Sequence, residues 1–542
     1  MAGTVRGRGF PIVEENPPDR GHRSGDLLGS IAEDLFAYLG KTFPVCCASD
    51  EFFYFPQVVP SPGGWPGWDD FSPEKIGEVK RRLSSAERDI GLLSGPPEDR
   101  EFPIDAETVL RVARTLREQL DEVRFHETQP TFHLTVLCTG LSSSLEDADR
   151  GGWSLRAQAV PAFLARARET LTGMPGIFRD LGLSMVRDTQ AWLTSLEKAE
   201  AETAPVLSAL ERFGDFLRSA RTRTDCLLPP EIVSRIVSEH IGCGVGPDEV
   251  RSVLREEMDE MRGIMEGLCE SRFSGARWQE AVRKIPLPDL PEGDPIPLYR
   301  KEVESLLRHC VDLGIVPEDL PGESPLRISL VPPYLQAIRA ASAYSFTPGH
   351  RSQEGTFFIV PSADAWKDQR EDLAEYLMLT AHETYPGHHL LDSWRWRFVS
   401  PVRRPVETPL FYEGWACFAE ELMRSTGYFS GPVDLLLLAK RRYRRAVRGL
   451  ADLDLQTGKR DPTSAAGLLA DAGFPGAAAS SVVRKYALRP GYQVCYAFGV
   501  RRFLDLYSRY GTGEEKRFVR AVLSCGEIGF DRVEDVLRGG SS

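Results

Sequence analysis

The sequence lacks the features that mark membrane proteins, nucleic-acid-binding proteins and secreted proteins. No apolar stretch is long and uncharged enough to span a bilayer, and residues 1–26 contain no apolar run typical of a secretory signal peptide. We therefore expect a soluble protein of the cytoplasm that does not bind membranes. The formal net charge of −13 also disfavours binding to nucleic acid, which carries charge of the same sign.

CxxC pairs of cysteines and internal repeats are absent as well. The ten cysteines are scattered without a CxxC pair, so neither a disulfide framework nor a thiolate zinc site is indicated. With 542 residues, of which 42% are hydrophobic and 27% charged, the chain has the composition of a globular protein with a sizeable core. We find no fixed-period repeat that would suggest a solenoid.

Apolar residues recur every three to four positions through most of the first three hundred residues, which predicts a mainly α-helical protein. The predicted helices are residues 26–39, 72–94, 106–123, 154–172, 177–221, 230–241, 246–271 and 297–313. The stretches expected to be loops or linkers, rich in Pro and Gly, are residues 55–68, 284–297 and 317–325.

Two short segments, residues 326–331 and 355–360, are rich in β-branched and aromatic residues and are bounded by Pro or Gly. They predict short strands and thus a small β-sheet. We expect residues 1–296 to form a mostly helical half and residues 297–542 to carry the functional site. The two halves are expected to form one intertwined unit.

Three of only nine histidines lie within residues 381–389, AHETYPGHH. The preceding segment has helical periodicity and places His382 and Glu383 near a helix C-terminus, an arrangement similar to the HExxH motif of zinc peptidases. In that motif two histidines bind the metal, and the glutamate is the general base for the metal-bound water. His382 is therefore the first predicted ligand of zinc or another divalent metal, and Glu383 the predicted general base.

The second histidine of HExxH is replaced by Pro386. Proline has no amide hydrogen to donate to the carbonyl of His382, so the helix must kink or extrude a loop at Pro386 and Gly387. On an undistorted helix, His389 would lie roughly 20° from the direction of His382, and His388 roughly 120° away. If Pro386 and Gly387 form a bulge, His388 takes the vacant ligand position instead. Because proline disfavours the undistorted helix, we favour His388 as the second ligand and keep His389 as the alternative.

A following helix is the expected source of a third ligand. Residues 409–423, PLFYEGWACFAEELM, place Glu413 and Glu420 seven residues apart on one face of a mainly apolar helix. Glu413 is the predicted third metal ligand. Glu420 is predicted to orient a His or Arg at the site, or to serve as an alternative ligand. The competing interpretation, surface charges on an ordinary helix, is less attractive beside the histidine cluster.

These motifs resemble those of a bacterial family, domain of unknown function 885 (DUF885), which is expected to contain zinc metallopeptidases. The family motifs HExxPGHH and EGWAxYxE match HETYPGHH at residues 382–389 and EGWACFAE at residues 413–420. PGYQVCYAFG at residues 490–499 is similar to a third family motif, PGQALSYKxG. It has Tyr, Cys and Ala where the family more often has Gln, Ser and Lys.

The resemblance implies a fold similar to the mainly α-helical zinc peptidases, with a deep central channel and a small β-sheet beside the metal-binding helix. It also implies a metal-dependent hydrolase that cleaves peptide or amide bonds, with a small peptide or amide as the substrate. Members of such families are also recruited to specialised biosynthesis, so membership does not name the substrate.

Further residues have predicted roles in substrate binding or catalysis. Tyr496 is the candidate for stabilising the oxyanion, and Tyr492 would share its face if the segment is helical. Pairs of tyrosines at this spacing also occur as core packing. Arg489 is a candidate for binding a substrate carboxylate.

The predicted strand at residues 355–360 suggests a backbone edge, beginning at Gly355, for binding an extended substrate. Residues 343–355, just before it, are expected to form a polar, Gly-rich loop over the site. A second His-Glu pair, His126 and Glu127, lacks the Gly and double His and is interpreted as structural.

Two other functions compete with hydrolysis. Two histidines and a carboxylate also suit non-haem Fe(II), so a repurposed metalloenzyme is the first alternative. A noncatalytic binding protein is the second. The glutamate directly beside His382 favours the hydrolase.

Overall fold

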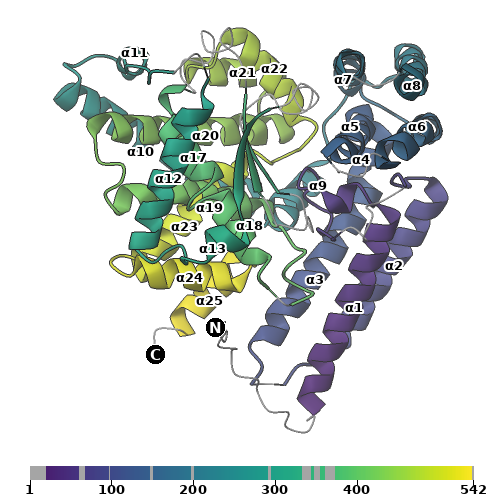
Figure 1. Ribbon diagram of the computed structural model, residues 1–542, viewed down its shortest axis with the longest axis horizontal. Helices are drawn as coiled ribbons and strands as arrows, with labels where there is room; N and C mark the ends of the chain where they lie inside the picture. Colours follow the sequence, from purple (N-terminus) through teal and green to yellow (C-terminus); the bar gives the residue numbers. More distant parts are fainter. Residues whose placement is uncertain are drawn as a thin grey trace, which may run out of the picture.

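The computed structural model describes residues 20–59, 67–96, 98–146, 151–196, 200–290, 294–331, 343–346, 355–360, 373–398 and 400–539. Within these ranges the protein is mainly helical and has one small sheet, as the sequence predicted. Every helix in the described part of the chain is too short or too polar to cross a membrane. The early and late helices form two groups that lie side by side in Figure 1.

The first group buries a core that is formed mainly by residues between 28 and 217. Its elements are α1 (Arg20–Thr42), η1 (Cys46–Ala48), α2 (Pro73–Gly91), α3 (Glu101–Glu118), η2 (Gln119–Val123), α4 (Phe125–Thr128), α5 (Pro130–Glu146), α6 (Gly151–Thr170), α7 (Gly176–Ser195) and α8 (Glu200–Ser219).

One long helix over residues 177–221 was expected in this group, and that prediction is wrong. The backbone becomes extended at Leu196 (φ −73°, ψ 134°), and α8 packs back against α7. A straight helix of that length would project about 65 Å, far past its neighbours, whereas a hairpin lets both apolar faces contact the same core.

The second group buries a larger core that contains the histidine cluster. Before the sheet it comprises α9 (Pro230–Arg235), η3 (Ile236–His240), α10 (Pro247–Arg272), α11 (Trp278–Arg283), α12 (Ile296–Asp312) and α13 (Leu320–Glu323). After the sheet it comprises α17 (Tyr376–Glu383), α18 (His388–Arg395), α19 (Pro409–Ser425), α20 (Pro432–Gln456), α21 (Pro462–Asp471), α22 (Gly476–Tyr486), α23 (Val494–Tyr510), α24 (Glu515–Cys525) and α25 (Phe530–Gly539).

The boundary at residue 296 stays a prediction. Helices α9 to α11 precede it in the sequence, yet residues of α10 and α11 belong to the second core, Ile232 of α9 packs against that core, and α10 packs along α20. The deep channel also stays a prediction, because residues 332–342, 347–354 and 361–372 lie outside the described part of the chain.

The sheet has the strand order β1-β3-β2, formed by β1 (Leu326–Leu330), β2 (Ala343–Phe346) and β3 (Gly355–Ile359). Strand β3 is central, parallel to β1 and antiparallel to β2. The predicted strands at residues 326–331 and 355–360 are thus confirmed.

Two expectations about this region are corrected. Residues 343–346, expected to be loop, form β2, because their alternating intermediate and buried side chains pack one face onto the core. Strand β3 offers no backbone edge from Gly355 onwards, because Gly355 pairs with both Leu326 and Phe346. The edge beside the histidine cluster belongs to β2.

Helices α19 and α23 approach closely at a pair of glycines. A Cβ on Gly499 would lie 2.6 Å from the Cα of Gly414 and 2.7 Å from the carbonyl oxygen of Leu410. Both neighbours are backbone atoms that cannot rotate away. The two glycines therefore set the spacing between the helix that carries Glu413 and the helix that carries Tyr496.

We expect Gly499→Ala to lower the free energy of unfolding by about 1–3 kcal/mol, because the added methyl overpacks the contact with Gly414. Gly467→Ala is the control, since Gly467 is exposed in α21 and its Cβ would meet nothing within 4 Å. It should stabilise the protein by about 0.5–1 kcal/mol. Calorimetric unfolding measures both, and equal melting temperatures for Gly499→Ala and wild type would refute the close-packing argument.

Candidate metal centre

The predicted interruption of the HExxH-like helix is present. Helix α17 ends at Glu383, residues 384–387 form a turn, and α18 begins at His388. A Cβ on Gly387 would lie 1.9 Å from the carbonyl oxygen of His382, so only glycine fits where the turn folds back on the helix end. The indole of Trp415 donates a hydrogen bond of 2.9 Å to the carbonyl of Pro386. The turn is thereby fixed to α19.

Three predicted ligands come together at this turn. The Nε2 atoms of His382 and His388 lie 3.8 Å and 3.6 Å from the same oxygen, Oε2 of Glu413. All three side chains are buried, and their ligand atoms lie within 4.8 Å of one another. Two imidazoles and one carboxylate match the protein ligands of catalytic zinc sites that leave a position open for water. The donor set therefore fits a zinc ion.

Glu413 is oriented by two phenols. The hydroxyls of Tyr492 and Tyr496 donate hydrogen bonds of 2.6 Å and 2.8 Å to its Oε1, which leaves Oε2 facing the imidazoles. Burial raises the pKa of Glu413, but His388, His382 and the Tyr492 hydroxyl outweigh it and hold the pKa at about 2. Glu413 is thus ionised at neutral pH.

The two tyrosines do not share a helix as the sequence suggested. Tyr492 lies in the turn before α23, whereas Tyr496 lies within its first helical residues. Burial, together with the charge of Glu413, raises the pKa of both phenols well above the usual value. Both hydroxyls therefore keep their protons and act as donors.

His382 is oriented by Glu420, which lies 3.0 Å from its Nδ1. Arg445 donates two hydrogen bonds to Glu420, of 2.6 Å and 3.0 Å, and Arg441 donates two more, of 2.9 Å and 3.0 Å. Although burial opposes it, the positive charge of these arginines holds the pKa of Glu420 well below its usual range. An ionised Glu420 accepts the Nδ1–H of His382, which leaves the Nε2 lone pair directed at the centre.

His389 differs from His388 in its surroundings. Its Nδ1 lies 3.2 Å from the hydroxyl of Tyr344, and its Nε2 lies 3.1 Å from both the carbonyl of Ser324 and the hydroxyl of Tyr385. Burial lowers the pKa of His389 to about 3, so the ring is neutral. Both ring nitrogens are therefore used in hydrogen bonds away from the centre.

His388 stacks on the ring of Tyr412, with centroids 4.1 Å apart and planes at 24°. The Tyr412 hydroxyl in turn donates to Asp392 at 3.2 Å. Burial acts to lower the pKa of His388, but the charges of Glu413, Glu383 and Asp392 outweigh it and raise the pKa. The ring is thus held by stacking on one side and by negative charge around it.

Glu383 is buried at the end of α17 and bonded to the sheet. The backbone N–H of Tyr344 on β2 donates a hydrogen bond of 2.8 Å to its Oε2. One carboxylate oxygen is thereby fixed. The structure thus connects the predicted general base to the strand that the sequence suggested was loop.

Arg489 and Gly355, the two remaining residues with predicted roles, are not part of the group of candidate ligands. The exposed Arg489 donates a hydrogen bond of 3.3 Å to the backbone carbonyl of Glu51, and its guanidinium covers the ring of Phe53. Phe53 contacts Tyr492, with ring centroids 4.7 Å apart, so Arg489 is one side chain removed from the tyrosine pair. A Cβ on Gly355 would lie 2.6 Å from the Nδ1 of His389, so this glycine makes room for the imidazole.

The arginines of α20 and the amide of Tyr344 were not foreseen. Arg441 and Arg445 stand four apart in a basic run, KRRYRR at residues 440–445, on one face of a helix. That spacing was the available signal, but charged residues on a helix usually face solvent. Nothing in the sequence indicated which amide would face Glu383.

We expect Glu420→Gln to weaken zinc binding by about 10–100-fold, because a neutral amide accepts the Nδ1–H of His382 less strongly. Glu421→Gln is a matched control. Glu421 is also buried in α19 and paired with arginines, Arg424 at 2.7 Å and Arg442 at 3.3 Å, but it does not contact His382. Competition with a zinc chelator measures both affinities, and equal losses in the two variants would contradict the role of Glu420.

Comparison with solved structures shows the fold. The chain is similar to a protein from Colwellia psychrerythraea described as a candidate lipoprotein (TM-score 0.77, 14% identity, 95% of this chain and 99% of that chain). It is also similar to a candidate lipoprotein of unknown function from Shewanella oneidensis (TM-score 0.71, 15% identity, 94% of this chain and 99% of that chain). At these identities the likeness shows the fold alone.

A carboxypeptidase from Pyrococcus furiosus also matches, with a TM-score of 0.43 and 10% identity over 97% of this chain and 96% of that chain. A similarity this low carries no argument. No curated protein matches the sequence significantly. The model of the family described as bacterial protein of unknown function (DUF885) matches residues 68–537, so the chain belongs to that family.

Proposed function

We propose that the protein is a zinc-dependent hydrolase of peptide or amide bonds in small substrates. The observation that carries the proposal is the convergence of His382, His388 and Glu413 within 4.8 Å, in a buried site. Glu383 adjoins the first of these residues in the sequence and is itself buried. A hydrolase needs both a metal-binding set and a nearby base, and the two occur together here.

When bound, zinc lowers the pKa of a coordinated water and polarises the scissile carbonyl. The residues of the chain supply the remaining functions. Glu383 accepts the proton of the attacking water and passes it to the leaving amine. The amide of Tyr344 holds one oxygen of Glu383 in place, so the carboxylate does not turn away between the two transfers.

Tyr496 is the residue proposed to stabilise the oxyanion. Its phenol is protonated because burial raises its pKa, and its side chain is only partly buried, whereas Tyr492 is buried. A phenol hydrogen bond aimed at developing negative charge lowers the barrier to acyl transfer. The single O–H of Tyr496 would leave Glu413 to do so, while Tyr492 would keep its hydrogen bond to Glu413 and hold that ligand.

Two other functions, non-haem iron chemistry and noncatalytic binding, are alternatives to zinc-dependent hydrolysis. Non-haem iron chemistry uses the same donor set, and metal analysis of protein purified without added metal separates the two. A noncatalytic binding protein has no need of buried imidazoles and carboxylates held by a network of arginines and tyrosines.

The cytoplasmic location stays a prediction, and cell fractionation tests it against the lipoprotein description of the two similar structures.

We expect one zinc ion per chain, and His388→Ala should lose it while His389→Ala keeps it. The reason is that His388, like His382, has a ring nitrogen facing Glu413, whereas both nitrogens of His389 bond elsewhere. Elemental analysis after dialysis gives the stoichiometry. If His389→Ala loses zinc and His388→Ala retains it, with circular dichroism showing both folded, the ligand assignment is wrong.

Glu383→Gln should lower kcat by at least 100-fold, as expected for loss of a general base, and leave the zinc content unchanged. A library of short peptides and N-acyl amino acids, analysed by mass spectrometry with the zinc-loaded enzyme, supplies the substrate for this comparison. Glu421→Gln serves as a control for buried charge in the same core. Turnover equal to wild type in Glu383→Gln would remove this residue from the mechanism.

A further inference from the structure

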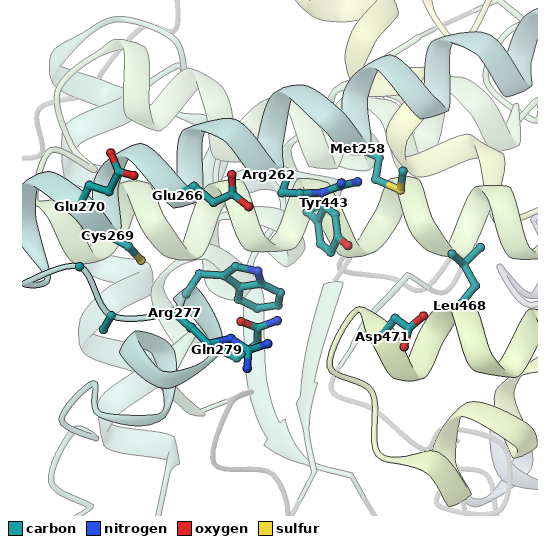
Figure 2. Close-up of a pocket in the computed structure, with 13 residues that line it drawn as sticks. Met258, Arg262, Glu266, Cys269, Glu270, Arg277, Gln279, Tyr443, Leu468 and Asp471 are labelled. Carbon is teal, nitrogen blue, oxygen red and sulfur yellow. The ribbon is translucent and has the colours of Figure 1, made fainter.

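A cavity of about 530 Å³ lies between α10, α11, α20 and α21, and none of the candidate metal-centre residues lines it (Figure 2). Tyr443 of α20 contributes to its wall. Arg441 and Arg445 both bind Glu420 of the metal centre. Each lies two positions from Tyr443 in α20, and side chains two positions apart on a helix point in nearly opposite directions. The cavity is therefore on the far side of α20 from the metal centre.

Two aromatic side chains contribute to its apolar surface. Trp278 and Tyr443 are each only 9% exposed, and their ring centroids are 5.9 Å apart at an interplanar angle of 66°. Neither the indole N–H nor the phenol hydroxyl has a hydrogen-bond partner among the described residues. In Figure 2 the hydroxyl of Tyr443 points into the cavity. Both donors are accessible from the cavity, so a bound ligand would find two hydrogen-bond donors there.

Unpaired charges of both signs surround this aromatic surface. The carboxylates of Glu266 and Glu270 on α10 and of Asp471 on α21 line the cavity, as does the guanidinium of Arg277 beside α11. All four residues are exposed, and none forms an ion pair with another described residue. Arg262 is different, because it pairs with Asp259 at 3.0 Å.

We propose that this cavity binds a zwitterionic ligand with an apolar or aromatic side chain, namely an amino acid or short peptide. A carboxylate would pair with Arg277, an ammonium group with the facing carboxylates, and the side chain would lie on Trp278 and Tyr443. Three carboxylates oppose a purely anionic ligand, and the unpaired Arg277 opposes a purely cationic one. The volume lies in the range of small-molecule sites. This site does not depend on the proposed hydrolase activity.

Isothermal titration of the full-length protein with the dipeptide phenylalanyl-leucine tests the proposal. Metal is first removed with a chelator, so that the dipeptide is not hydrolysed. We expect saturable 1:1 binding. The N-acetylated dipeptide and the C-terminal amide should each bind at least tenfold more weakly, because each lacks one of the two charges.

Variants locate the binding. Arg277→Gln and Asp471→Asn change exposed side chains and should each weaken binding at least tenfold, and Tyr443→Phe should weaken it severalfold. Arg255→Gln, an exposed position on α10 outside the cavity, should bind as wild type does.

The result also separates this site from the metal centre. His388→Ala should bind the dipeptide with wild-type affinity even if it has lost zinc, so the two proposals fail independently. The proposal is overturned if no saturable binding occurs, if the blocked dipeptides bind as well as the free one, or if Arg277→Gln and Asp471→Asn have no effect.

Discussion

The candidate metal centre depends on one backbone contact, the turn at Gly387 that folds onto the carbonyl of His382. A side chain at this position would collide with that oxygen at 1.9 Å, so the turn requires glycine. Because the first helix stops at Glu383 and the second starts at His388, two short helices present their imidazoles to one point. A continuous HExxH helix reaches the same result with a single turn, and here proline forbids it.

Around this turn, α19 carries most of the chemistry that holds the centre together. Glu413 faces the imidazoles, Trp415 binds the turn, and Glu420 orients His382 seven residues further on. Each buried carboxylate has several hydrogen-bond donors, which offset the high cost of desolvating a charge. Glu413 has two phenols and Glu420 has two arginines. The electrostatics therefore tie α19 to α20 and to α23.

The same helices serve two surfaces. One face of α20 carries the arginines that stabilise the ionised form of Glu420, and the opposite face carries Tyr443, which lines the cavity between α10, α11, α20 and α21. Close contact of Gly414 with Gly499 keeps α23 near enough for its tyrosine to reach Glu413. Packing of the second core thus sets the geometry of the metal centre, while the first helical group buries a core of its own.

The sequence by itself determined what depends on neighbours along the chain. It predicted the helical body, the strands β1 and β3 and the break at Pro386, since short motifs and helical spacing specify these locally. The grouping of His382 and His388 with Glu413 is a contact between helices, and it was predicted from the motifs rather than from local structure. Only the tertiary structure decided that α7 and α8 are separate helices packed against each other and that β2 contacts Glu383. It alone also showed that Arg441 and Arg445 turn inward. These features arise from packing between distant segments, and one sequence does not specify which faces will meet.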